Sequence, residues 1–352
     1  MNFKSIIFIF ASNFIEMKKL SLILGLFMVA QSWMFAQDTL PAPTSYRVNK
    51  VSFNMVRVEK GGFWMGAQHK DTAEFNYDRH SQTDELPVHY VQMREDYYIG
   101  QTEVTQKLWK AVMGYNPSAK KCPKRPVTNV NYFEVQEFLR RIDSITGMQF
   151  RLPTEDEWEY AARGGKYTRG YIYSGSKEVD RVAWHNGNTS KLKKVKKRAA
   201  NELGIYDMSG NVWEWCSSKY RYFDRERNAN LGKDGEMYCI RGGAWQLPKT
   251  SCRVSWRGKR LPDLKNSFGG FRLCLDARYV KEKEEASEPD MIKKPSEDVS
   301  EEGFFRGQCR GGDFLHAEVA DFCEVQSDDK FVSVRLLRIL RILRELKKRF
   351  LR

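Results

Sequence analysis

The chain of 352 residues contains 41% hydrophobic residues and nine tryptophans, a composition that indicates a globular protein and excludes a largely disordered one. This length accommodates one large domain or two small ones, in either case with a well-buried core. The formal net charge of +14 is concentrated in residues 330–352, which hold nine Lys or Arg against one Glu, so the charge gives no support for a nucleic-acid partner.

The N-terminal residues 1–36 have the pattern of an export signal. Translation is expected to start at Met17, because two lysines and an apolar stretch from Leu20 to Val29 follow it, and Ala36 ends a plausible cleavage site. An uncleaved membrane anchor is the alternative, but the apolar run is shorter than the roughly 20 residues of a spanning helix. We therefore predict an exported protein that is periplasmic, on the cell surface or secreted.

Three helices are predicted in chain order, each with a polar N-cap and a glycine that ends it. They run from Thr102 or Thr105 to Met113, from Asn131 to Gly147, and from Thr154 to Gly164. The second presents Phe138 and Ile142 on one face, and the third presents Trp158 with Ala161 or Ala162 to the core.

The first turn of the third helix carries the carboxylates of Glu155, Asp156 and Glu157. Negative charge at a helix N-terminus is favoured by the helix dipole. We therefore interpret these three side chains as caps rather than as catalytic groups.

Short aromatic or β-branched segments separated by Gly, Asn and Pro predict strands between and after the helices. They include Phe63–Met65, Tyr97–Ile99, Cys239–Arg241 and Phe271–Leu273. From His185 onward no long periodic segment occurs before the C-terminal tail. This combination predicts an α+β domain rich in irregular loops, spanning residues 46–278.

The C-terminal part is predicted to lie outside this domain. Residues 281–329 begin with a mixed-charge, proline-containing segment without apolar periodicity, which indicates a disordered linker. Residues 330–352 have the pattern of a basic amphipathic helix. Such a helix could contact an anionic membrane surface or dock on a partner, or it could be a terminal helix without a function of its own.

The seven cysteines leave at least one thiol unpaired or in an intermolecular bridge, since disulfides in an exported chain use them in pairs. They are Cys122, Cys216, Cys239, Cys252, Cys274, Cys309 and Cys323. None forms a CxxC pair, and the five histidines form no HExxH set, so the sequence gives no indication of a zinc site.

Seven sequence motifs follow one another through the predicted domain. They are VEKGGFWMG (58–66), DELPVHYV (84–91) followed by YYIGQTEVTQ (97–106), PVTNVNYFEVQEF (126–138), RLPTEDEWEYAARGG (151–165), NELGIYDMSGNVWEW (201–215), IRGGAW (240–245) and FGGFRL (268–273). In this order they resemble the formylglycine-generating enzyme (sulfatase-modifying factor) family. The resemblance implies the loop-rich fold of that family, which is similar to the C-type-lectin-like fold.

The resemblance also implies a calcium site in the segment NELGIYDMSGNVWEW. Its ligands would be the side chains of Asp207 and Glu214 and the backbone carbonyls of Gly210 and Val212, which are oxygen donors of the type that calcium prefers. The alternative is that this segment only provides core packing and a Gly-Asn turn. The family's other calcium site falls on residues 183–197, which are basic here, and we do not carry it over.

Active members of the family oxidise a cysteine of a sulfatase peptide to formylglycine and hold copper with two cysteines after an RGGS motif. Here Cys252 matches the second cysteine, but Leu247 stands at the first and Ala244 replaces the serine. A leucine cannot ligate a metal, and Cu(I) needs soft ligands such as a thiolate pair. Copper is therefore not expected, and Cys252 remains a candidate catalytic thiol only if another residue, such as Cys239 or Cys274, completes the pair.

We predict an exported member of this family that binds a protein, peptide or glycan and lacks the copper oxidase activity; the alternative is a cysteine oxidase. Aromatic residues interleaved with arginines could line a binding groove, although ordinary packing would explain them too. These aromatic residues are Trp184, Tyr220, Tyr222, Phe223 and Trp245, and the arginines are Arg221, Arg225 and Arg227.

Overall fold

The computed structural model describes residues 42–231 and 236–280. No helix within these residues combines the length and the apolar character that crossing a membrane requires. Three of the predicted segments lie outside the described residues: the signal at 1–36, the linker at 281–329 and the basic helix at 330–352.

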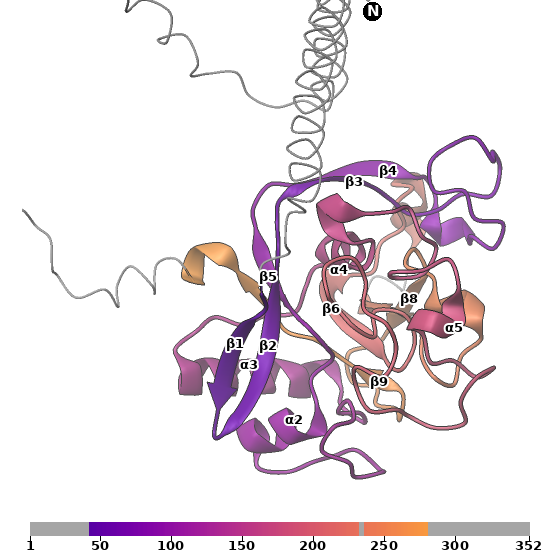
Figure 1. Cartoon of the computed structure of the whole chain (residues 1–352). Helices are drawn as coiled ribbons and strands as arrows, with labels where there is room; N and C mark the ends of the chain where they lie inside the picture. Colours follow the sequence, from indigo (N-terminus) through magenta and orange to yellow (C-terminus); the bar gives the residue numbers. More distant parts are fainter. Residues whose placement is uncertain (1–41, 232–235, 281–352) are drawn as a thin grey trace, which may run out of the picture. The chain divides into compact units, whose positions relative to one another are not determined.

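The first sheet joins the two ends of the domain (Figure 1). Its order is β1-β2-β5-β10, with every neighbouring pair antiparallel. The strands are β1 (Thr44–Val48), β2 (Val51–Val58), β5 (Tyr97–Gly100) and β10 (Cys274–Asp276). Asn49 and Lys50 connect β1 to β2 with φ angles of 44° and 66°, as in a two-residue hairpin turn. Leu275 pairs with Tyr98, so the end of the domain is held by its first half.

The remaining strands form a hairpin and a second sheet. The hairpin pairs β3 (Gly61–Met65) with β4 (His89–Met93), and the second sheet has the order β8-β7-β6-β9. Its strands are β6 (Trp213–Lys219), β7 (Tyr238–Arg241), β8 (Arg257–Arg260) and β9 (Gly269–Gly270). The predicted strand Phe271–Leu273 is wrong, because these residues connect β9 in this sheet to β10 in the first one.

The three predicted helices are confirmed within one or two residues at their ends. They are α2 (Gln106–Met113), α3 (Tyr132–Thr146) and α4 (Glu155–Ala162), and a single turn, α5 (Val179–Val182), was not predicted. Thr105, Asn131 and Thr154 accept the N-cap hydrogen bonds, the last two in full capping boxes. Short 3-10 helices lie at Thr83–Glu85, Gly165–Tyr167, Glu226–Asn230 and Lys249–Cys252.

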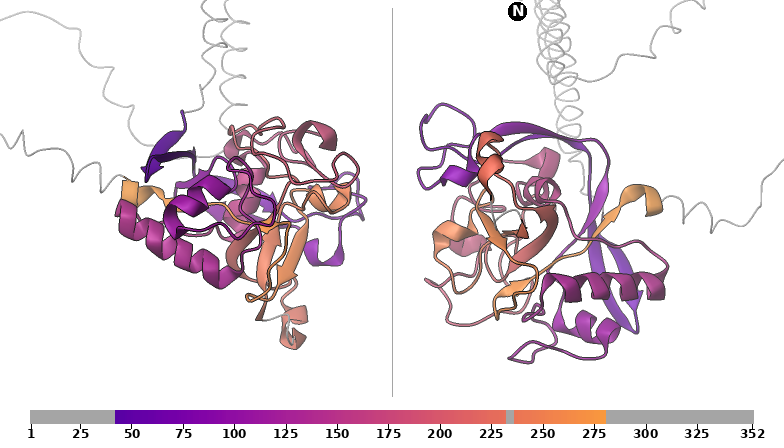
Figure 2. Two further views of the ribbon diagram at one scale, coloured as in Figure 1. Left: turned by 90° about the horizontal axis from the view of Figure 1, so that it is seen from below. Right: turned by 180° about the vertical axis from the view of Figure 1, so that it is seen from behind.

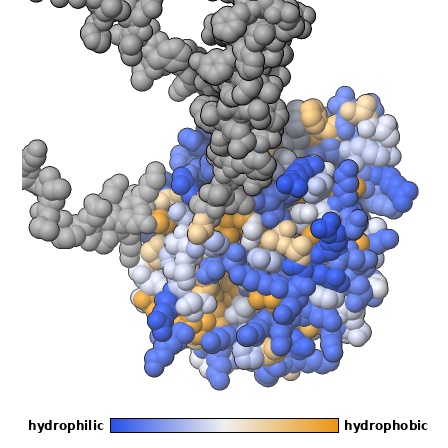
Figure 3. All heavy atoms as spheres, in the orientation of Figure 1, coloured by the Kyte–Doolittle hydropathy of each residue, from blue (hydrophilic) through white to orange (hydrophobic). Residues whose placement is uncertain are grey.

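Two hydrophobic clusters form the core. In the first, α2 and α3 pack on each other and on the β1–β2 hairpin (Figures 1 and 2). Within this cluster Trp109 stacks on Phe138 with ring centroids 5.2 Å apart. In the second, α4 packs against β3, β6 and β7 and buries Trp158 and Tyr160 completely. Polar side chains cover most of the face shown in Figure 3.

Candidate functional site

The loop after β7 contains the two positions at which the family resemblance implied copper ligands. Gly242 and Gly243 follow the strand with φ angles of 92° and 70°. A Cβ at Gly243 would lie 2.4 Å from the carbonyl oxygen of Ser251, so only glycine allows this close approach. The glycine pair therefore folds the loop back onto the 3-10 turn that ends at Cys252.

Leu247 and Cys252 offer no pair of thiolates in this loop. Leu247 packs against the first hydrophobic cluster, and its carbonyl accepts a hydrogen bond of 3.0 Å from the amide of Asn186. The Cys252 side chain is fully buried, and burial raises the pKa of its thiol to about 12. The thiol is therefore protonated at neutral pH, the form that neither attacks nor ligates.

The other two cysteines considered as partners are held elsewhere. Cys239 donates from its thiol to Glu155 at 3.1 Å, and Cys274 lies 3.9 Å from Glu157. Burial raises the pKa of both thiols well above its ordinary value. All five cysteines of the described residues are free thiols.

The carboxylates of α4 do more than cap the helix. Glu157 completes the capping box with Thr154, as predicted, and also pairs with Arg151. Glu155 is instead buried and receives two hydrogen bonds of 2.7 Å from Arg257. Burial alone would raise its pKa, but the charges of Arg257 and Arg241 outweigh burial and hold the pKa at about 2. The interpretation of Glu155 as a cap is therefore corrected: it is the centre of a buried ion pair.

The structure brings the predicted calcium residues into one tight turn before β6. Asp207 has a φ of 59°, is buried, and accepts a hydrogen bond of 2.8 Å from the amide of Lys196. Gly210 lies against the backbone of Trp184. Glu214 is fully buried and receives two hydrogen bonds of 2.6 Å from Arg272.

A third buried carboxyl group, Glu103, lies beside this turn, and the sequence analysis did not predict it as part of the site. It accepts a hydrogen bond of 2.9 Å from the side-chain amide nitrogen Nδ2 of Asn211, while its other oxygen is buried without a partner among the described residues. Burial raises the pKa of Glu103 well above its ordinary value, and the charges of Asp207 and Glu214 raise it further. No sequence signal marks Glu103, because 108 residues separate it from Asn211.

This turn offers oxygen donors of the type that calcium prefers, although both carboxylate oxygens of Glu214 already accept hydrogen bonds from Arg272 and one also accepts from Trp158. Buried carboxyl groups without enough cationic partners favour a bound cation, and Asp207, Gly210, Val212 and Glu214 would supply carboxylate and carbonyl oxygens. Arg272 shares Glu214 with any such ion. No group of three or more His, Cys, Asp or Glu suited to a metal occurs in the described part of the chain, so the site stays a prediction.

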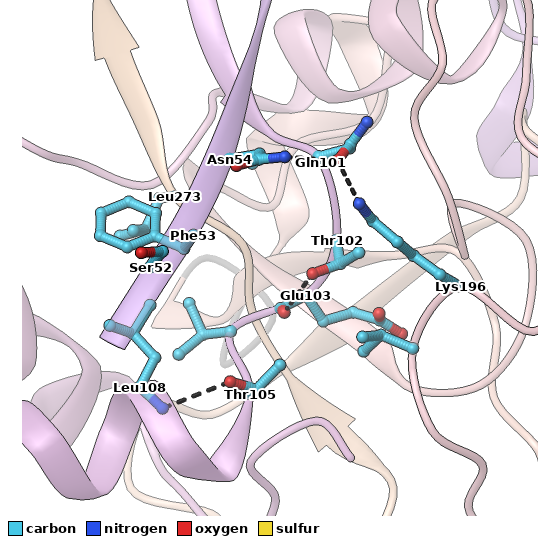
Figure 4. A pocket seen from close by; sticks show the side chains of 13 residues that line it. Ser52, Phe53, Asn54, Gln101, Thr102, Glu103, Thr105, Leu108, Lys196 and Leu273 are labelled. Carbon is cyan, nitrogen blue, oxygen red and sulfur yellow. Dashed lines mark hydrogen bonds between the residues drawn. The ribbon is translucent and has the colours of Figure 1, made fainter. Parts of the chain in front are cut away.

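A cavity of about 220 Å³ lies next to the turn, between β2 and the segment after β5 (Figure 4). Figure 4 shows Lys196 reaching toward Gln101, whose side-chain oxygen accepts from Lys196 and, at 3.2 Å, from Asn54. Glu103 and Thr102 also line the cavity. Apolar side chains such as Phe53, Leu108 and Leu273 line the cavity as well, and its polar groups are already hydrogen-bonded in part.

The predicted aromatic groove separates into two groups by its contacts. Tyr220, Tyr222 and Phe223 pack with the second hydrophobic cluster, and Arg257 stacks on Phe223 at 3.8 Å. Trp184 and Trp245 are instead both tied to Asn211. The amide of Asn211 donates to the Trp184 carbonyl, and the amide of Trp245 donates to the Asn211 carbonyl, each at 2.9 Å.

Comparison with known proteins decides the family. The model of the sulfatase-modifying factor enzyme 1-like domain matches residues 43–277. The chain belongs to this family. The predicted α+β, loop-rich fold is confirmed by the similarity to the solved structure of Treponema denticola variable protein 1. That protein is 29% identical, with a TM-score of 0.55, over 67% of this chain and 99% of its own.

Relatives within the sulfatase-modifying factor family carry different names. The chaperone protein LppX of Paenibacillus barcinonensis is 33% identical over 47% of this chain and 74% of its own length. The formylglycine-generating enzyme of Streptomyces coelicolor is 29% identical over 48% of this chain. The bovine protein named inactive C-alpha-formylglycine-generating enzyme 2 is 26% identical over 49% of this chain. The chain spans 58% of the length of each of the last two relatives.

Proposed function

We propose that this protein binds a partner and does not oxidise cysteine with copper. Leu247 carries the proposal, because a half-buried leucine that packs against the first hydrophobic cluster stands where a copper-binding cysteine would be needed. The remaining thiol, Cys252, is buried and protonated at neutral pH. A single protonated thiol does not provide the soft, two-coordinate sulfur site that Cu(I) prefers.

The family relatives support a role other than oxidation. One relative is itself named an inactive enzyme, and another is named a chaperone protein. A protein or peptide is therefore the first class of partner to test, and a glycan is the second. We propose a partner in the periplasm, at the cell surface or outside the cell, and the support for this is the export pattern of residues 1–36.

The decisive experiment is a Cu(I) titration of the full chain against a competing chelator, with the variants L247C and C252A. Wild type and C252A are expected to bind no copper, and L247C is expected to gain a site because metal binding displaces the thiol protons. Incubation with a cysteine-containing sulfatase peptide and oxygen should leave the peptide unmodified. Tight binding of one copper by wild type that disappears in C252A would establish the oxidase instead.

We also propose that calcium binds the turn of Asp207, Gly210, Val212 and Glu214. The support is the donor type and the unpartnered oxygen of Glu103. Calcium should raise the melting temperature of wild type, because an ion that binds only the folded state stabilises it. The variant D207N should lose this response, and a chelator should reverse it in wild type. Equal melting curves of wild type with calcium and with chelator would contradict the proposal and would mean that Arg272, without calcium, provides the positive charge beside the carboxylates of the turn.

A further inference from the structure

Two basic segments, distant in sequence, lie side by side on the domain. The amide of Val195 donates a hydrogen bond of 3.0 Å to the carbonyl of Lys124. We call the two segments together the basic surface; neither contains an Asp or a Glu. It consists of Lys120, Lys121, Lys124 and Arg125 in the first segment and Lys191, Lys193, Lys194, Lys196, Lys197 and Arg198 in the second.

Asp207 and Asp180 lie near the Lys196 and Arg198 cations of the basic surface, but neither forms an ion pair with them. Elsewhere on the domain, cations at the surface pair with carboxylates, as Lys166 does with Glu59 and Lys265 with Glu134. The ten cations of the basic surface form no such ion pair with any described carboxylate. The Nε atoms of Arg125 and Arg198 are also shielded from solvent without a hydrogen-bond partner there.

The second segment is held in place through its backbone and one indole ring. Its amides at Lys193 and Lys196 donate to Asn211 and Asp207 at 3.1 and 2.8 Å. The guanidinium carbon of Arg198 lies 3.7 Å from the ring centroid of Trp184, and the ammonium of Lys193 lies 4.7 Å from it. The remaining side chains are exposed on a fixed backbone, which lowers the entropy cost of binding.

The basic surface adjoins the loop that carries Leu247 and Cys252, the positions at which the family resemblance implies copper ligands. Trp184, under Arg198, shares Asn211 with Trp245 through backbone hydrogen bonds, and the amide of Asn186 donates to the carbonyl of Leu247. A partner that contacts the loop after β7 would therefore also contact the basic surface. The inference below rests on the proposed partner-binding function.

The surroundings of the charges favour one class of anionic partner. Two cations already lie over the Trp184 ring, so this ring is not available for stacking nucleic-acid bases. The hydrophobic side chain Leu192 is buried, so the segment presents little that would insert into a membrane. Carboxylates spaced along an extended peptide match unpaired cations spaced along two adjacent segments. We infer that the basic surface binds an acidic segment of a protein partner.

The inference is tested by fluorescence anisotropy of the full chain with a labelled glutamate-rich peptide and its glutamine counterpart at physiological ionic strength. The glutamate peptide should bind and the glutamine peptide should not. The variant K194E/K197E should weaken binding by about tenfold or more, since it reverses two exposed charges. The variant K60E/K70E, with the same charge change at exposed lysines outside the basic surface, should bind as wild type does.

Other outcomes overturn the inference. Equal weakening by both double variants would show a response to net charge alone. Tighter binding of an oligonucleotide or of anionic vesicles, lost in K194E/K197E, would show that the partner belongs to another class. The milder K194Q/K197Q keeps the test valid if charge reversal unfolds the chain. Copper binding by wild type would overturn the proposed function while leaving the peptide result standing, so the two failures are distinguishable.

Discussion

Single residues of α4 show how strongly burial changes the role of a side chain. Glu155, Asp156 and Glu157 follow one another in sequence, and the helix dipole favours all three. Only the structure separates Glu157, which caps the helix, from Glu155, which neutralises Arg257 in the interior. The partners of Glu155 could not be predicted, because 102 residues separate it from Arg257.

The variant E155Q is expected to lower the free energy of unfolding by about 3–5 kcal/mol, because it leaves the buried Arg257 without its counter-charge, whereas Arg241 keeps Glu159. The pKa of Glu155 is lowered from 4.5 to about 2, so its stabilising contribution is complete above pH 4.5 and lost as the pH falls toward 2. Urea unfolding between pH 3 and pH 7 measures both effects. E137Q is the control, since Glu137 pairs with Arg140 at the surface and should change stability little. An unchanged midpoint for E155Q would contradict the buried ion pair.

At the scale of elements, local signals predicted the helices and failed where the chain changes sheets. Polar N-caps and terminal glycines are signals that lie within a few residues of each helix end, so α2, α3 and α4 could be predicted from the sequence. The segment Phe271–Leu273 has the composition of a strand, but its position between β9 and β10 depends on both sheets. The grouping of Glu103 with the turn at Asp207 depends on long-range packing in the same way.

The turn before β6 depends on a glycine at Gly210, which has a φ of 80°. A Cβ there would lie 2.4 Å from the carbonyl oxygen of Trp184, whereas a Cβ at Gly204, with a φ of 77°, would meet nothing within 4 Å. G204A should therefore cost only the left-handed strain, about 1–2 kcal/mol. G210A should cost more, because the backbone of Trp184 must also move. Chemical unfolding of the two variants measures the difference, and equal losses would rule out the close approach.

On the scale of the whole molecule, one group of charges connects parts of the chain that are far apart in sequence. Glu103 follows β5, the turn at Asp207 precedes β6, and Arg272 lies between the two sheets. The turn could be predicted as a site from the family motif, but its shortage of cations could not. It arises because one buried guanidinium, Arg272, faces all three carboxyl groups, while the charge of Lys196 acts on Asp207. A hydrogen bond to the Gly100 carbonyl holds Arg272 in this position.

This shortage predicts a stability that falls as the pH rises. Burial raises the pKa of Asp207 from 3.8 to about 6, despite the hydrogen bond from Lys196 and the charge of Arg272. The folded protein therefore holds a proton that the unfolded chain releases between pH 4 and pH 6, and the free energy of unfolding should decrease across this interval. In D207N, which keeps the acceptor and tolerates the positive φ, this decrease should be smaller. Urea unfolding from pH 4 to pH 7 gives the free energy of unfolding of wild type and of D207N, and the difference between them at each pH is the contribution of Asp207. Glu155 loses its stabilising effect only at lower pH. A difference that stays constant with pH would mean that Asp207 titrates normally and that the turn already holds its counter-ion.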